Sequence, residues 1–210
     1  MRSRPDFALR STWATLFRQV ALIFPGEVDR DGPPPLVPFA ADDPSIAAWE
    51  AAMHPLDPSA TGALVEILDP RPDPSSSPMI APRTDLAVEV WVECELSVLH
   101  AAWRLLLHAP AEADHVPATR DRLARAVRWH LERTQPDNAT TRPWGVHAVL
   151  ELGAPWVEAS DYAASMIHAV EAAGHARSAI DPLSAWILLD AAEGVERGGA
   201  GVRFDSASVD

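Results

Sequence analysis

The sequence predicts an all-α fold: antiparallel helical hairpins, arranged as an orthogonal bundle or a partial α/α toroid, with a Pro-rich and largely irregular N-terminal arm. Apolar residues recur at helical spacing from about residue 84 onward, and capping and breaking residues bracket each such segment. Fourteen of the 20 prolines precede residue 84. We therefore divide the chain into an arm (1–83), a helical core domain (84–194) and a flexible tail (195–210) rich in Gly and Ser.

The arm is expected to contain two short helices. Ser11 can cap the first, which ends at Phe24 because Pro25 and Gly26 follow it. The second is expected over residues 43–53, where Ile, Trp and Met share one face. Residues 69–78 contain four prolines and three serines, which predicts a linker or an extended surface arm.

Five helices with short connections are expected in the core, and such helices pack as antiparallel hairpins. Each has a polar residue that can cap its start: Thr84 or Asp85, Thr119, Thr141, Ser160 and Asp181. Pro143 and Pro182 suit first-turn positions. The expected ends are His108, Thr134, Gly153, Gly174 and Gly194.

Composition excludes several functional classes. The net charge of −13 argues against binding to nucleic acid or to an anionic membrane surface. All 17 basic residues are Arg, so no lysine nucleophile exists, and the single Cys94 excludes an intramolecular disulfide and a Cys-based zinc cluster. We also find no serine-hydrolase elbow, Walker loop, dinucleotide-binding glycine pattern or zinc-protease helix. Without an export signal or a long apolar run, the protein is expected to be soluble and cytoplasmic.

The predicted helix ending at His108 carries one narrow polar stripe on an otherwise apolar surface. Its members follow one another at intervals of three or four residues: Glu89, Glu93, Ser97, His100, Arg104 and His108. We favour a solvent-facing seam. The alternative is a cavity wall in which Glu93 and His100 form a general-base pair. Glu95 lies on the opposite side, where we expect it to be exposed or paired with an Arg.

His130 and Asp190 occupy positions that helical spacing assigns to apolar side chains. Both are therefore expected inside the core, and Asp190 is expected to pair with an Arg or His of a neighbouring helix. A structural tie is the favoured interpretation of each residue. A catalytic or ligand-binding role is the alternative, so His130 and Asp190 join Glu93 and His100 as catalytic candidates.

The segment 135–144 is dense in polar residues at a helix entrance, where backbone N–H groups attract anions. Its candidate ligand-binding residues are Asp137, Asn138, Arg142 and Trp144. Turn and capping chemistry explains the same residues without any ligand, and we favour that explanation.

Three pairs combine a histidine with a carboxylate at helical spacing: His147 with Glu151, Glu171 with His175, and Asp161 with His168. Each pair lies opposite the main apolar stripe of its helix, so we expect solvated faces. A metal site would need ligands from several helices to converge, and the spacing shows no convergence. No metal and no cofactor are therefore predicted.

Two functional hypotheses remain. The favoured one is a binding or assembly module without catalysis, which binds a protein partner. The alternative is a small enzyme or ligand-binding domain that takes a small molecule into a polar interior built from Glu and His groups. Convergence of Glu93, His100, His130 and the Asp137–Trp144 loop would favour the alternative.

The expected burial of Asp190 yields a stability prediction. Asp190→Ala should lower the melting temperature more than Glu193→Ala, because Glu193 lies at the edge of the same apolar face. Loss of Asp190 leaves its partner unpaired, at a cost of about 1–3 kcal/mol. Thermal unfolding of the two variants measures the difference, and equal small shifts would mean that the helix face is assigned wrongly.

Overall fold

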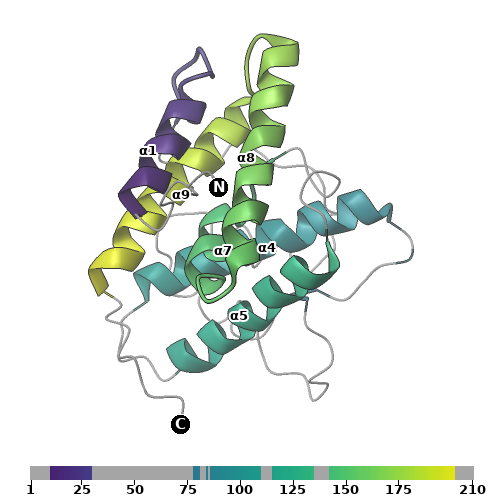
Figure 1. The fold of residues 1–210 in the computed structure, drawn as a ribbon, viewed down its shortest axis with the longest axis vertical. Coiled ribbons are helices and arrows are strands. Elements are labelled where there is room, and N and C mark those ends of the chain that lie inside the picture. Colours follow the sequence, from purple (N-terminus) through teal and green to yellow (C-terminus); the bar gives the residue numbers. More distant parts are fainter. Residues whose placement is uncertain are drawn as a thin grey trace, which may run out of the picture.

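In a computed structural model of the chain, residues 10–29, 78–80, 84, 86–109, 115–134 and 142–201 are described. This part of the chain is helical and contains no strand, which confirms the predicted all-α class (Figure 1). No helix in it is long and apolar enough to cross a membrane. Its helices are α1 (Arg10–Ala21), α4 (Val88–His108), α5 (His115–Arg133), α7 (Val146–Leu152), α8 (Val157–Arg177) and α9 (Pro182–Gly201). The helix predicted over residues 43–53 lies outside the described residues, as do Asp137 and Asn138.

The first and last described helices lie side by side (Figure 1). The buried face of α1, which includes Trp13 and Phe17, belongs to the same core cluster as the apolar residues of α9. At the rim, the Arg18 guanidinium donates to both Glu196 carboxylate oxygens at 2.7 Å. Helix α1 falls in the segment that the sequence assigns to the arm, yet it packs on the core.

Helix α4 is buried along most of its length and contacts α5, α7 and α9. It buries aromatic, aliphatic and polar side chains alike, from Trp91 to Trp103. The solvent-seam interpretation of its polar stripe is wrong at the centre, because Ser97 and His100 are fully buried. Neighbouring helices cover the stripe there, and only its two ends, Glu89 and His108, are exposed.

Helix α7 is shorter than expected because a turn precedes it. Gly145 adopts φ +70°, a left-handed conformation that favours glycine, and α7 begins directly after it. A Cβ atom at this position would lie 3.2 Å from the Leu96 carbonyl oxygen of α4, so the turn also requires close backbone approach. Pro143 therefore precedes the helix and does not occupy its first turn, while Gly153 ends it as predicted.

Several other predicted helix boundaries are wrong. Helix α4 begins at Val88 with no side-chain cap, and Thr119 lies inside α5. Ser160 lies within the first turn of α8. Asp181, in contrast, caps α9 as predicted: its carboxylate accepts hydrogen bonds from the Ser184 N–H at 3.1 Å and the Ser184 hydroxyl at 2.6 Å.

Two glycines expected to stop helices lie inside them instead. Helix α8 continues past Gly174 and ends where Ser178 adopts φ +64°, and α9 continues past Gly194 to Gly201. Tertiary packing explains Gly194, because a Cβ atom there would lie only 2.7 Å from Cδ2 of His147. Gly194 thus lets α9 approach the His147 ring on α7, and its role is close contact between helices.

We predict that Gly194→Ala destabilises the protein. Alanine is about 1 kcal/mol better than glycine inside a helix, but here its methyl group collides with a buried ring. Urea unfolding should show a net loss of about 1 kcal/mol or more. Gly198→Ala is the control, because a Cβ atom there would meet the Glu151 carboxylate at 3.1 Å, at the end of a longer side chain. Equal effects of the two substitutions would contradict the close-contact role.

Candidate buried polar site

The imidazole of His100 is held between α9 and the turn before α7. Its Nε2 lies 3.1 Å from Oδ2 of Asp190, and its Nδ1 accepts the Gly145 N–H at 3.3 Å. Because Nδ1 is an acceptor, a neutral ring carries its proton on Nε2 and donates it to Asp190. His100 therefore links α4 to both α7 and α9.

Asp190 is largely buried on α9, with 13% of its side chain exposed, and both carboxylate oxygens have donors. Arg104 Nε donates to Oδ1 at 2.8 Å, and His100 faces Oδ2. Burial alone would raise the pKa of Asp190, but the hydrogen bond from His100 and the positive charge of Arg104 outweigh it and hold the pKa well below its usual range. The prediction that Asp190 is buried and paired with an Arg or His of another helix is confirmed.

His147 on α7 is fully buried beside His100, with ring centroids 4.3 Å apart and planes at 72°. Neither of its ring nitrogens has a hydrogen-bond partner within the described part of the chain. Burial lowers the pKa of His147 well below its ordinary value, so the ring is neutral at pH 7. The predicted solvated face for His147 and Glu151 is wrong, because both are buried.

Two tryptophans border these groups. The Trp144 ring lies edge-on to His100 with centroids 5.3 Å apart, and the Trp186 ring lies 6.2 Å from His100. The Arg104 guanidinium lies 5.6 Å from the centre of the Trp186 ring. The polar groups thus have aromatic walls, which lower the local dielectric and strengthen electrostatic interactions between them.

We call His100, His147 and Asp190 the His–Asp centre. One nitrogen of each imidazole and one carboxylate oxygen of Asp190 lie within 4.8 Å of one another. The three residues come from α4, α7 and α9, so only the tertiary fold brings them together. This is the convergence of ligand-type residues from several helices that the sequence does not show.

Glu93 does not belong to this centre. The alternative interpretation, in which Glu93 and His100 form a general-base pair, is therefore wrong. The Glu93 carboxylate instead accepts a hydrogen bond from Nη1 of Arg142 at 2.5 Å. Nε of the same guanidinium lies 3.6 Å from Asp181. Arg142 therefore joins α4 to the start of α9. It precedes Trp144, whose ring contacts His100, by two residues in the sequence.

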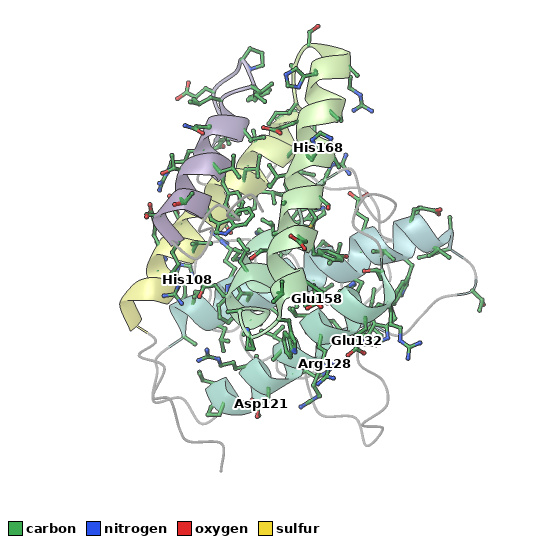
Figure 2. All side chains as sticks on the ribbon, in the orientation of Figure 1. His108, Asp121, Arg128, Glu132, Glu158 and His168 are labelled. Carbon is green, nitrogen blue, oxygen red and sulfur yellow. The ribbon has the colours of Figure 1, made fainter. Side chains whose placement is uncertain are left out.

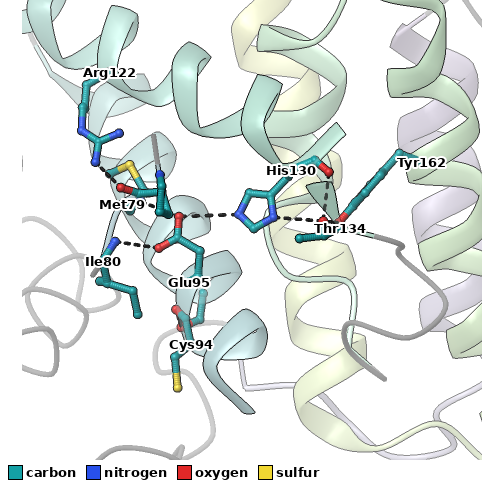
Figure 3. Close-up of polar contacts among 10 residues, drawn as sticks. Met79, Ile80, Cys94, Glu95, Arg122, His130, Thr134 and Tyr162 are labelled. Carbon is teal, nitrogen blue, oxygen red and sulfur yellow. Dashed lines mark hydrogen bonds and ion pairs between the residues drawn. The ribbon is translucent and has the colours of Figure 1, made fainter. Parts of the chain in front are cut away.

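A second buried network surrounds Glu95, between α4, α5 and residues 78–80 (Figure 3). The carboxylate of Glu95 is 0% exposed and accepts the Met79 N–H at 2.5 Å and the Ile80 N–H at 2.7 Å. Arg122 donates to the Pro78 carbonyl beside it. The expectation that Glu95 is exposed is therefore wrong, because it is buried and backbone N–H groups satisfy it, whereas the expected charge interaction with an Arg is present, with Arg122.

His130 lies inside the core, as predicted, and contributes to the Glu95 network. Its Nε2 lies 3.5 Å from Glu95, an ionic contact too long for a good hydrogen bond. Its Nδ1 lies 3.2 Å from the Thr134 hydroxyl, which in turn contacts the Tyr162 hydroxyl at 2.7 Å. His130 thus has polar partners on two sides, whereas His147 has none among the described residues.

The remaining histidines of α4 and α8 lie at the surface. Figure 2 labels His108 and His168, both exposed, and Asp161 and His175 are exposed as well. The solvated-face prediction for Asp161 with His168 is therefore confirmed. His147 differs from these residues because α9 packs against its ring at Gly194, a tertiary contact that spacing within one helix does not reveal.

Comparison with known proteins adds no assignment. No protein-family model matches the sequence, and no match was found among curated proteins or solved structures. The function must be inferred from the geometry of the two buried networks.

We predict that Glu95→Gln destabilises the fold and releases residues 78–80. A glutamine offers one carbonyl oxygen to two backbone N–H groups, and its NH2 group faces the other donor. The cost should be about 1–3 kcal/mol. Hydrogen exchange should show loss of protection at the Met79 and Ile80 amides. The control is Glu93→Gln, whose carboxylate is partly exposed; unchanged protection in Glu95→Gln would rule out this anchoring role.

Proposed function

We propose that this chain is a small ligand-binding domain whose working site is the His–Asp centre. One observation carries the proposal: His147 is fully buried, and both of its ring nitrogens lack a partner in the described structure. Folded proteins pair nearly all of their buried polar groups, so an exception needs an explanation. A ligand that completes the pairing supplies one.

His147 differs from Asp190 and His100 in its contribution to the free energy of folding. An unpaired buried polar group costs about 1–3 kcal/mol, whereas an apolar side chain at the same position would cost nothing of this kind. Asp190 and His100 satisfy each other and stabilise the fold. His147 gives no such benefit, and residues that cost stability are typical of functional sites.

The position of His147 limits what it can bind. Its ring is enclosed, so the ligand must be small enough to fit among the packed side chains of α4, α7 and α9. A neutral imidazole offers one lone pair and one N–H group. The adjacent Asp190 carboxylate adds negative charge, which favours a cationic or Lewis-acidic ligand. Trp144 closes one side, in keeping with its candidate ligand-binding role.

Four further features of the chain belong to this proposal. The helices pack as hairpins, in an orthogonal bundle or a partial α/α toroid with a Pro-rich arm, which contacts between the consecutive pairs α4–α5 and α7–α8 support. The protein is cytoplasmic. The net charge of −13 supports a partner that is not nucleic acid. The favoured sequence hypothesis, an assembly module that binds a protein partner, stays a prediction.

Two matched variants test the proposal. In protein refolded from denaturant, which frees it of bound ligands, His147→Leu should raise the free energy of unfolding by about 1 kcal/mol. His130→Leu should lower it by about 1–3 kcal/mol, because Glu95 and Thr134 lose a partner. Both histidines are fully buried, so burial is controlled. If His147→Leu is as damaging as His130→Leu, His147 is a structural residue and the proposal fails.

A further inference from the structure

We propose that His100, His147 and Asp190 bind one divalent transition-metal ion such as Zn²⁺ or Fe²⁺. This inference rests on the proposed function and names the ligand class of the same site. It replaces the sequence prediction of no metal, which rested on the absence of converging ligands. The three side chains come from three different helices and place their ligand atoms within 4.8 Å of one another.

The donor set suits this class of ion. Two imidazoles and one carboxylate form the protein ligands of many zinc sites and of mononuclear iron sites. Calcium and magnesium prefer oxygen ligands, and copper(I) prefers sulfur. Two nitrogens and one oxygen therefore point to Zn²⁺ or Fe²⁺. With three protein ligands, at least one coordination position stays free for water or a substrate oxygen.

The spacing requires only small movements. Ligands of a tetrahedral ion at about 2.0–2.1 Å lie roughly 3.3 Å from one another. Nε2 of His100 and Oδ2 of Asp190 are already 3.1 Å apart. The His147 ring, whose centroid is 4.3 Å from that of His100, has to approach them. No hydrogen bond holds either of its nitrogens within the described structure, so this approach breaks none.

Neighbouring groups orient the carboxylate. Arg104 Nε donates to Oδ1 of Asp190 and leaves Oδ2 directed at the centre, which favours a single Asp190 oxygen as ligand. Ligation by Nε2 of His100 moves its proton to Nδ1, so the 3.3 Å hydrogen bond from the Gly145 N–H is lost. That bond is long, and a metal–nitrogen bond replaces it.

The Glu95 network does not compete for this role. Both oxygens of Glu95 already accept backbone N–H groups, and His130 Nδ1 contacts Thr134. A metal ion there would have to displace donors that hold residues 78–80 in place. The two networks each contain a carboxylate and a histidine, and Nε2 of His130 also lacks a hydrogen-bond partner, but among the described residues it is the His–Asp centre that brings three ligand atoms within 4.8 Å of one another.

The test uses the full chain, stripped of metal with a chelator and titrated separately with Zn²⁺, Fe²⁺ under anaerobic conditions, and Co²⁺ as a spectroscopic probe. We expect one ion per chain, a visible d–d absorption band for bound Co²⁺, and a higher melting temperature with metal. His147→Leu should weaken binding at least tenfold and abolish the Co²⁺ band. His168→Ala, which removes an exposed histidine of α8, should change neither.

The outcomes separate the two proposals. If His147→Leu stabilises the ligand-free fold but none of the three ions binds stoichiometrically, the metal inference fails and ligand binding stands. Equal binding by wild type and His147→Leu places the ion elsewhere and also overturns the inference. Asp190→Asn provides a second check: it should lose metal while keeping helical circular dichroism, because the asparagine carbonyl can still accept from Arg104 and its NH2 group can donate to Nε2 of the other His100 tautomer. Retained tight binding in Asp190→Asn would exclude the carboxylate as a ligand.

Discussion

The described fold depends on how it accommodates a carboxylate inside a helical core. Asp190 is anionic and largely buried, and its two oxygens are satisfied by side chains of a single helix, α4. His100 and Arg104 lie one turn apart on that helix, so their donors reach the two oxygens from one side. This interaction links α4 to α9, and through the Gly145 N–H it also fixes the turn that begins α7. Helix α7 contacts both members of this pair, α1 packs on α9, and α8 packs on α7.

Helix α4 carries a buried carboxylate of its own, Glu95, which is stabilised in a different way. Within the described residues, Glu95 accepts two consecutive backbone N–H groups, and His130 Nε2 lies 3.5 Å from it. These backbone donors belong to a segment that lies shortly before α4 in sequence, and the carboxylate holds that segment against the core (Figure 3). One carboxylate joins two helices, and the other joins a helix to residues 78–80. The two sides of α4 are therefore specified by polar contacts as well as by apolar packing.

Local sequence signals predicted the helices, Asp190 and His130 well, because an apolar period interrupted by one polar residue is visible along a single helix. They failed for Glu95 and His147. Glu95 is buried by residues 78–80, and His147 by α9, and neither partner can be read from spacing within one element. Gly174 and Gly194 also misled: glycine breaks isolated helices, but here Gly174 leaves room for Ile180 in the following loop, and Gly194 allows α9 to approach the His147 ring of α7. Tertiary contacts decide these positions, and His147 is the one among them that belongs to the His–Asp centre.

The pairing of α1 with α9 has a consequence for the order of folding. The Arg18–Glu196 contact spans 178 residues and the His100–Asp190 contact spans 90. Contacts of such long range form late, because the intervening chain must first be brought together. During synthesis α1 leaves the ribosome before α9, and its Trp13 and Phe17 face has no α9 to cover it until residues 182–201 have been translated. The nascent chain therefore exposes this apolar face while the intervening residues are made, and the His–Asp centre assembles only once α9 has emerged.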